Sequence, residues 1–385
     1  MKQTAQPHRT TTSSGPRRGR PSRPALYERL RSEVREMRAR FGGLPAATEA
    51  EQIWRDIWYE EAHNSTAIEG NTLARSEVET LLRTGKTVGN KQLKDYLEVR
   101  GYADAARWVY GQALGSEEGW RGDKLVTLAE AREVHRIALT PAWEFEAPEH
   151  SLPEESPGNW RRHEIEPFVS GMTPPAWTDV PSQVTDWVDS AATLQRDDPN
   201  LFERIAELHA EFERIHPFLE GNGRTGRLVL NLILVRLGYP PAVIFYRDRP
   251  RYLDALAKAD RGDPAPLGEM LVRAVHNNLL RLVYPAIAGE VKLVPLEALA
   301  SNKTSVVALR QAAQRGRLQA IQGPDRVWRS TKKWVLEYIE SRYASLRRPE
   351  RSRAPTAYRA SVDAGGPVDP GASTPYATKT VTKGS

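Results

Sequence analysis

The sequence predicts a mainly α-helical fold for residues 25–285, and two helical patterns support this prediction. In the first pattern, apolar residues recur at alternating steps of four and three, as on a helix buried along one side. These residues are Leu201, Ile205, Leu208, Phe212 and Ile215. The polar residues at 197–199 precede this pattern and indicate where the helix starts. In the second, residues 228–237 are apolar on almost every side, which is typical of a helix in the middle of a bundle. Gly238 and the prolines at 240–241 end this helix.

Two regions depart from the helical pattern. Between residues 146 and 181, proline and glycine punctuate two β-like runs at 160–165 and 168–170, which predict a β-hairpin lying over the bundle. Residues 290–345 have a different pattern and predict a small separate domain. Its expected elements are helices at 296–300 and 305–314 around a turn at 302–304, strands at 318–321 and 326–329 around a turn at 323–325, and a helix from residue 331.

The composition excludes several classes of protein. The chain has 385 residues, room for about two to three domains of roughly 150 residues each. It contains no cysteine, so disulfides, Cys-ligated zinc, iron–sulfur clusters and thiolate nucleophiles are excluded. The longest apolar stretch, 228–245, is interrupted by polar residues and prolines, and the N-terminus lacks the apolar core of a secretory signal. We therefore expect a soluble, cytoplasmic protein with no membrane span.

The net charge of +6 is distributed unevenly along the chain. Residues 1–24 carry six basic and no acidic side chains, residues 25–300 carry 33 basic and 43 acidic ones, and residues 301–353 carry 13 basic and four acidic ones. An acidic body therefore lies between two basic segments. Residues 1–24 and 350–385 have few large apolar side chains and are predicted to be disordered. The basic arm is either a solvated tail or a weak contact for nucleic acid or acidic partners.

Residues 216–227 carry the clearest chemical pattern. A polar, glycine-rich loop that leads into an apolar helix presents backbone N–H groups and the positive end of the helix dipole, which together can hold a phosphate. Glycines in such a loop let the main chain approach a ligand closely; they are Gly221, Gly223 and Gly226. Arg224 and Arg227 are one helical turn apart, so both guanidinium groups can converge on one polyphosphate.

Two further side chains of this segment fit the same chemistry. Glu220 supplies a hard oxygen ligand where a Mg²⁺ ion that bridges phosphates needs one. His216 closes the preceding helix and is a natural general base, because the ordinary pKa of histidine lies nearest neutrality. A zinc site built from His209 and His216 is excluded, since their seven-residue spacing places them two helical turns apart.

The segment 216–227 resembles the signature of the Fic (filamentation-induced-by-cAMP) family, HxFx(D/E)GNGRxxR, and matches it at every defined position. The resemblance covers residues 25–288, in which residues 158–175 are similar to the family's substrate flap. It implies a Fic helical bundle that transfers AMP from ATP to a hydroxyl group of a target protein, and of the enzyme itself, with release of pyrophosphate. The implied co-substrate is ATP, the implied cofactor is Mg²⁺, and the implied partner is a protein modified on serine, threonine or tyrosine.

The resemblance also implies a role for each motif residue. His216 would take the proton from the target hydroxyl as it attacks the α-phosphorus, and Glu220 would hold Mg²⁺ against the α- and β-phosphates. The remaining positions would bind the nucleotide: Gly221, Asn222 and Gly223 as an anion hole, Gly226 beside it, Arg224 at the α- and β-phosphates, Arg227 at the γ-phosphate, and Asn231 near the nucleotide.

Residues 65–71 resemble the family's inhibitory helix motif, (S/T)xxxE(G/N). Taken alone, they are a helix end followed by a turn. The resemblance implies that Glu69 pairs with Arg227 and denies it to the γ-phosphate, which would leave a weakly active resting enzyme. In some relatives the same glutamate aligns a water molecule and the enzyme removes AMP. A de-AMPylating phosphodiesterase that uses the same site is therefore the first alternative.

The two non-helical regions bear on partners. Residues 157–161 begin the predicted flap, whose edge either pairs with an extended target segment or is an ordinary covering loop. Residues 290–345 resemble a winged helix, and basic residues such as Arg315, Arg317 and Arg329 favour DNA phosphates, although many winged helices bind proteins or position a dimer. An alternative of a different class is therefore a DNA-binding regulator with the Fic body as nucleotide sensor. A second copy of the chain is a further candidate partner.

Overall fold

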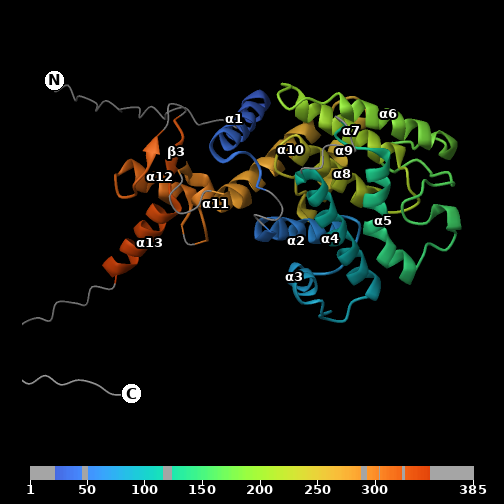
Figure 1. Ribbon diagram of the computed structural model, residues 1–385, viewed down its shortest axis with the longest axis horizontal. Coiled ribbons are helices and arrows are strands. Elements are labelled where there is room, and N and C mark those ends of the chain that lie inside the picture. Colours follow the sequence, from blue (N-terminus) through green and yellow to red (C-terminus); the bar gives the residue numbers. More distant parts are fainter. Residues whose placement is uncertain are drawn as a thin grey trace, which may run out of the picture. The chain divides into compact units, whose positions relative to one another are not determined.

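The computed structural model describes residues 22–45, 51–115, 124–287, 293–302, 304–322 and 326–346 (Figure 1). The helices up to residue 287 are α1 (Arg23–Phe41), α2 (Glu51–Ile68), α3 (Arg75–Thr84), α4 (Leu93–Leu114), α5 (Leu128–Phe145), α6 (Val180–Ala192), α7 (Leu201–Ile215), α8 (Asn222–Arg236), α9 (Arg249–Asp260), α10 (Ala265–Asn278) and α11 (Tyr284–Ile287). The prediction of a mainly helical fold is confirmed. None of the described helices is long and apolar enough to cross a membrane.

The two predicted disordered ends lie outside the described residues, apart from the last positions of the first one. There, helix α1 already begins at Arg23, with Pro24 in its first turn. The first compact unit of the chain ends at Glu340 and contains the helical bundle and the elements from residue 293 onward. Of the second unit, 341–385, the structure describes only the end of the last helix.

Helix α8 lies in the middle of the bundle (Figure 1). Its residues 224–235 are all buried, and it packs against α4, α5 and α7. The apolar stripe of α7 is buried at all five positions that the sequence predicts. Both helix predictions are confirmed. Because the loop 216–221 joins the end of α7 to the start of α8, two well-packed helices fix it at both ends.

The ends of these two helices agree closely with the sequence prediction. Helix α7 begins at Leu201, directly after a turn in which the Asn200 N–H donates to Oδ1 of Asp198 at 2.8 Å. Gly238 has a φ of +80°, a left-handed conformation that favours glycine, and its N–H donates to the Val235 carbonyl at 2.8 Å. This turn ends α8.

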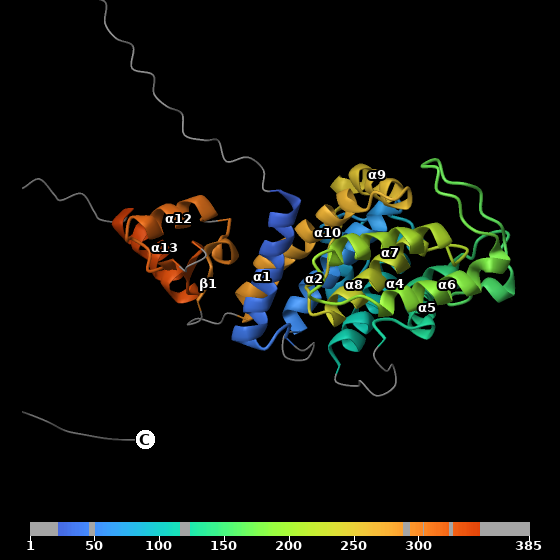
Figure 2. The same ribbon diagram turned by 90° about the horizontal axis from the view of Figure 1, so that it is seen from above.

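The predicted β-hairpin between residues 146 and 181 is wrong. Figure 2 shows this stretch as a long loop between α5 and α6, and its only regular elements are the short 3₁₀ helices η1 (Pro153–Glu155) and η2 (Trp177–Asp179). Its main-chain groups are bound in a different way from those of a hairpin. The buried Arg161 guanidinium donates to the carbonyls of His163, Pro175 and His216 at 2.7–2.8 Å, and a single turn joins Phe168 N to the Met172 carbonyl at 2.9 Å.

The remaining elements form a small module with its own apolar core around Leu296, Leu309, Leu318 and Val335. In order they are β1 (Val294–Pro295), the 3₁₀ helix η5 (Leu296–Leu299), α12 (Val306–Gln314), β2 (Ile321–Gln322), β3 (Trp328–Ser330) and α13 (Lys332–Leu346). The strands form an antiparallel sheet in the order β1-β3-β2, with Val294 opposite Ser330 and Ile321 opposite Arg329. The helices and two of the strands are close to their predicted places, but β1 was missed. The predicted turn at 323–325 lies outside the described residues.

A buried ion pair joins α5 and α8, two helices that pack beside the loop 216–221. Arg236, the last residue of α8, pairs with Glu130 in the first turn of α5, and the two side chains are 2% and 1% exposed. Nη1 of Arg236 lies 3.0 Å from Oε2 of Glu130 and also donates to the Leu125 carbonyl at 2.9 Å. A cation in so dry a place depends on its carboxylate partner.

We expect Glu130→Gln to lower the free energy of unfolding by about 3 kcal/mol, because Arg236 would stay buried and charged without its partner. Asp104→Asn is the matched control, since it breaks the solvent-exposed pair Arg100–Asp104 and should cost less than about 1 kcal/mol. Urea unfolding followed by circular dichroism measures both values. Equally small losses would contradict the structural role of the buried pair.

Candidate active site

The loop that precedes α8 is shaped by its own side chains. His216 ends α7 in a left-handed conformation, with a φ of 49°. Gly221 has a φ of +76°, and a Cβ there would collide with the side chain of Leu139. The Asn222 side chain closes the loop on Phe218, since Oδ1 accepts from the Phe218 N–H and Nδ2 donates to its carbonyl, both at 2.8 Å. Gly221 and Asn222 therefore determine the course of the chain into α8.

A cavity of about 330 Å³ opens beside this loop. Its walls come from the motif, from the end of α2, from the loop after α5, and from α9. The residues that line it include His216, Gly223, Arg227, Glu69, Glu213, Phe168, Met172, Arg249, Tyr252 and Leu256. The structure thus brings together residues from both sequence motifs, and a volume of this size is ordinary for a small-molecule site.

His216 is prepared to accept a proton. Its Nδ1 lies 3.2 Å from the Glu213 carbonyl, and because a carbonyl can only accept, Nδ1 carries the hydrogen and Nε2 keeps its lone pair. Burial lowers the pKa of His216 to about 4, with a further contribution from Arg161. The ring of Phe168 lies 5.0 Å from the imidazole, centroid to centroid. The imidazole is therefore neutral at neutral pH.

Arg227 is buried, with 5% of its side chain exposed, and it binds the end of α2. Its Nε donates to Ser65 Oγ at 2.7 Å, and Nη2 donates to the Ser65 carbonyl at 2.9 Å and to Glu69 Oε1 at 2.7 Å. Gly223 makes this approach possible, because a Cβ there would collide with Oε1 of Glu69. The contact between Glu69 and Arg227 that the resemblance implies is thus present.

The ion pair keeps Glu69 charged at the wall of the cavity. Burial by itself would raise the pKa of this carboxyl, but the attraction and hydrogen bond of Arg227, with smaller contributions from Arg224 and Arg249, outweigh burial and hold the pKa below its ordinary value. Arg249 also donates from Nε to the Ile68 carbonyl at 2.6 Å, which holds the last residue of α2. The end of α2 is therefore bound by two arginines from two different helices.

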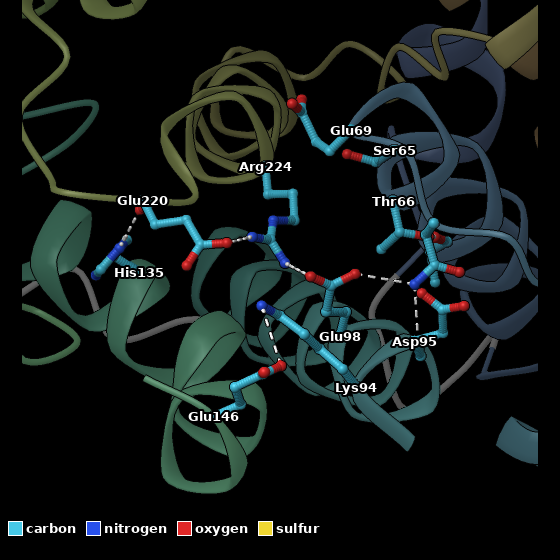
Figure 3. Close-up of polar contacts among 12 residues, drawn as sticks. Ser65, Thr66, Glu69, Lys94, Asp95, Glu98, His135, Glu146, Glu220 and Arg224 are labelled. Atoms are coloured by element: carbon cyan, nitrogen blue, oxygen red, sulfur yellow. Dashed lines mark hydrogen bonds and ion pairs between the residues drawn. The ribbon is translucent and has the colours of Figure 1, made fainter. Parts of the chain in front are cut away.

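The other motif arginine, Arg224, lies between two carboxylates (Figure 3). Its Nη1 is 3.3 Å from Glu98 Oε1 and its Nη2 is 3.5 Å from Glu220 Oε1. Glu98, on α4, also accepts a hydrogen bond from Nδ2 of Asn71 at 3.0 Å. Sequence reasoning missed Glu98, since nothing in its local pattern distinguishes it from a solvated helix residue.

His135 is a second residue that sequence reasoning missed. It is buried on α5, its ring stacks on Phe218 at 3.7 Å, and its Nε2 lies 2.9 Å from the Glu220 carbonyl (Figure 3). Its Nδ1 accepts from the Gly158 N–H at 2.8 Å, so the hydrogen is on Nε2. Burial lowers the pKa of His135 to about 3. A neutral imidazole thus fixes both the motif loop and the loop after α5.

Glu213 places a second carboxyl group in the cavity. It lies one turn before His216 on α7, and its Oε1 is buried without a hydrogen-bond partner among the described residues. Burial raises the pKa of Glu213 to about 7, although Arg227 opposes the shift. The close packing of Gly226 against this carboxyl group requires glycine, since a Cβ would collide with Oε1. Gly226 therefore acts by making room for Glu213 against α8.

Asn231 does not line the cavity. Its Nδ2 donates to Glu61 at 2.6 Å and to the Ala242 carbonyl at 3.2 Å, and its Oδ1 accepts from the Ala242 N–H at 2.8 Å. These bonds leave its amide group fully occupied within the bundle. His209 is also used internally, with Nε2 2.7 Å from the Tyr252 hydroxyl.

The donor set can be compared with the needs of a magnesium ion. Among the described residues no group of three or more acidic or histidine side chains could hold a metal ion by itself. Mg²⁺ bound with a nucleotide needs only one or two carboxylates, because phosphates and water supply its other ligands. Glu220 is partly exposed at 37% and fits that requirement.

The comparisons with known proteins can now be added to this geometry. Residues 125–234 match the family model described as Fic/DOC family. The chain contains a Fic domain. The matched residues begin just before α5 and end within α8. They include His135, the motif loop 216–221 and Arg227.

Curated relatives extend the match beyond the domain. The protein adenylyltransferase Fic of Nematostella vectensis is 29% identical over 283 residues, covering 72% of this chain and 61% of the relative. The protein adenylyltransferase fic-1 of Caenorhabditis elegans is 28% identical over 290 residues, covering 72% and 53%. The chain thus spans between about half and three fifths of the length of these curated relatives.

Solved Fic structures share the fold. Fic-1 (residues 134–508) from C. elegans superposes with a TM-score of 0.52 at 28% identity, covering 66% of this chain and 71% of that one. A Fic domain containing signaling protein from Bacteroides thetaiotaomicron gives a TM-score of 0.52 at 25% identity, covering 68% and 96%. The family resemblance of the sequence is therefore confirmed.

Proposed function

We propose that this Fic protein is a protein adenylyltransferase that transfers AMP from ATP to a hydroxyl side chain of a target protein and of itself. One observation carries the proposal: a neutral histidine and a buried motif arginine line the same cavity, and the arginine is bound by a carboxylate that a phosphate can replace. Relatives that carry the name protein adenylyltransferase support it.

The proposed reaction uses these residues in a simple order. The target hydroxyl attacks the α-phosphorus of ATP, the bond from that phosphorus to the oxygen bridging to the β-phosphate breaks, and pyrophosphate leaves. His216 takes the hydroxyl proton on Nε2, the nitrogen that does not bond the Glu213 carbonyl. Arg224 and Arg227 neutralise charge on the phosphates, as phosphoryl-group transfer requires.

Magnesium fits this scheme at Glu220. The carboxylate is the motif's acidic group, it is partly exposed, and Arg224 contacts only its Oε1 at 3.5 Å. When bound, the ion would neutralise phosphate charge. The chain's own contribution is to hold the Glu220 backbone in place, which His135 does through the carbonyl.

Glu69 is proposed to keep this site at rest. As long as it occupies Arg227, that guanidinium group is not available to the γ-phosphate, and Glu69 adds a negative charge where the triphosphate would lie. The same carboxylate could instead orient a water molecule for removal of AMP from a modified protein. Measurement of both directions with one variant distinguishes the two reactions.

We expect Glu69→Gly to raise auto-modification from labelled ATP by at least tenfold, because Arg227 becomes free to bind the γ-phosphate. Glu69→Gln is the matched control: it keeps the side-chain size but loses the charge, and should give an intermediate rate. Mass spectrometry of the Glu69→Gly protein in lysate with ATP and Mg²⁺ identifies the target and the transferred group. An unchanged rate would contradict autoinhibition, and faster AMP release by wild type than by the variant would favour the reverse reaction.

The pKa of His216 gives a further prediction. In the Glu69→Gly background, kcat for transfer at saturating ATP should stay level from pH 8 to pH 6 and decline only as the pH approaches about 4, because the base is lost when His216 is protonated. Adding His216→Ala should abolish transfer while ATP binding, measured by calorimetry, persists. If half of the activity is lost near pH 6.5, the base is instead a histidine with an ordinary, solvent-exposed environment.

We propose a second role for the module at 293–346, that of a winged helix which contacts DNA. Arg315 and Arg317 follow α12 and are exposed, as are Lys332 and Lys333 at the start of α13. Arg329 is not part of this surface: it is 9% exposed, and its Nη2 lies 2.6 Å from Glu36 Oε2. The proposed DNA-binding surface therefore consists of Arg315, Arg317, Lys332 and Lys333, which lie outside the small sheet.

Gel shifts of the full chain on duplex DNA across a salt series test this role. The double variant Arg315→Ala, Arg317→Ala should reduce the slope of log affinity against log salt by about 2, roughly one unit for each phosphate that the variant no longer neutralises. Arg83→Ala, Arg107→Ala removes the same charge from the helical bundle and should leave the slope unchanged. Binding that does not depend on salt, or no binding at all, would favour a module that docks on protein.

A further inference from the structure

A second cavity of about 560 Å³ lies outside the active site. Its walls come from the middle of α2, the start of α3, the chain between α8 and α9, and the end of α10. The volume is within the usual range for small-molecule sites. No residue of the Fic signature lines it, and the proposed adenylyl transfer does not use it.

The charge of this cavity contrasts with that of its surroundings. Residues 25–300 carry ten more acidic than basic side chains, yet the cavity is lined by three arginines, Arg75, Arg247 and Arg281, and only one carboxylate, Glu60. Glu60 is already paired with Arg75, with Oε1 2.6 Å from Nη2. The other two guanidinium groups are therefore the cations available to a ligand.

Among the residues that the structure describes, neither Arg247 nor Arg281 is neutralised by a close partner. Arg247 lies over the ring of Phe245 at 4.5 Å, and its ion pair with Asp248 is long, 3.8 Å, between exposed side chains. Arg281 makes no hydrogen bond or ion pair with any other residue in the described ranges. It is carried by a π-helical turn, η4 (Leu279–Val283), and such single turns occur frequently at functional sites.

We propose that this cavity binds a phosphorylated small molecule with a flat apolar part. Arg247 and Arg281 would bind the phosphate with charge-assisted hydrogen bonds. Phe245, with Val243 and Leu282, provides the apolar wall for the remainder of the ligand. Nδ1 of His63, which is buried without a hydrogen-bond partner among the described residues, offers one more polar contact at the same cavity.

The second cavity is connected to Glu69 by one short segment. Phe245 and Arg247 line the second cavity, whereas Arg249 lines the active site and donates to the Ile68 carbonyl at 2.6 Å. Between them, the Tyr246 N–H donates to Oδ1 of Asn64 at 3.0 Å. A ligand that draws Arg247 toward itself pulls on these two bonds to α2, those of Tyr246 and Arg249. Given the proposed adenylyl transfer, the ligand weakens the hold of Glu69 on Arg227 and activates the enzyme.

Binding is tested first, in the full-length protein, with 4-methylumbelliferyl phosphate as the probe and calorimetry as the measurement. Arg247→Ala and Arg281→Ala should each weaken binding at least tenfold, and 4-methylumbelliferone, which lacks the phosphate, should not bind. Arg100→Ala on the surface should leave binding unchanged, and Arg227→Ala in the active site should not weaken it, because breaking the contact with Glu69 can only favour the ligand. Absence of binding, equal binding of the dephosphorylated compound, or loss of binding in Arg227→Ala alone would each overturn the proposal.

The regulatory effect is tested by auto-modification from labelled ATP. Saturating probe should raise the rate at least threefold in wild type. It should not change the rate of Glu69→Gly, or that of the double variant that combines Arg247→Ala with Arg281→Ala. A wild-type rate that does not respond to bound probe, or an equal response in Glu69→Gly, would overturn the connection to Glu69. If no variant transfers AMP, the proposed function fails, while the calorimetric result still decides whether the cavity binds the phosphorylated ligand.

Discussion

The buried charge of Arg227 determines how this site is built. A guanidinium group that is 5% exposed must have acceptors within the protein, and here it has Ser65 Oγ, the Ser65 carbonyl and the carboxylate of Glu69. This need explains why α2 ends beside α8 and why position 223 is a glycine. A phosphate can replace a carboxylate without leaving the cation unpaired. The resting contact and the proposed nucleotide contact thus satisfy one electrostatic requirement with two different partners.

The two motif arginines differ in what holds them. Arg224 is placed by Glu98 of α4, a contact that does not involve Glu69. Arg227 is bound mainly by the end of α2, which Arg249 and Tyr246 hold from the other side. In the proposed mechanism, the position for the α- and β-phosphates therefore exists in the resting enzyme, whereas the position for the γ-phosphate depends on α2. In that mechanism, movement of one helix end would change activity without unfolding the site.

Local sequence patterns predicted the central helices and the loop, because both depend on residues close together in the chain. The contact between Glu69 and Arg227 spans 158 residues and followed only from the family resemblance. Glu98 and His135 were missed, since each is a single polar residue on an ordinary helix with its partner far away in sequence. Arg161 lay in the predicted start of the flap, but its bonds to distant carbonyls were missed for the same reason. The hairpin was wrong because apolar alternation does not reveal that one arginine binds the main-chain carbonyls across this loop.

In the proposed mechanism, Glu213 would let the cavity accommodate a highly charged nucleotide. A triphosphate adds several negative charges beside a carboxyl group that, with a pKa of about 7, is partly protonated at neutral pH. The added negative charge raises that pKa further, so Glu213 takes up a proton and no longer repels the phosphates. Its position one turn before His216 keeps this proton close to the base without a hydrogen bond that would compete for Nε2. In that mechanism the cavity would adjust its own charge to the ligand, while His216 would stay neutral and accept the proton of the target hydroxyl.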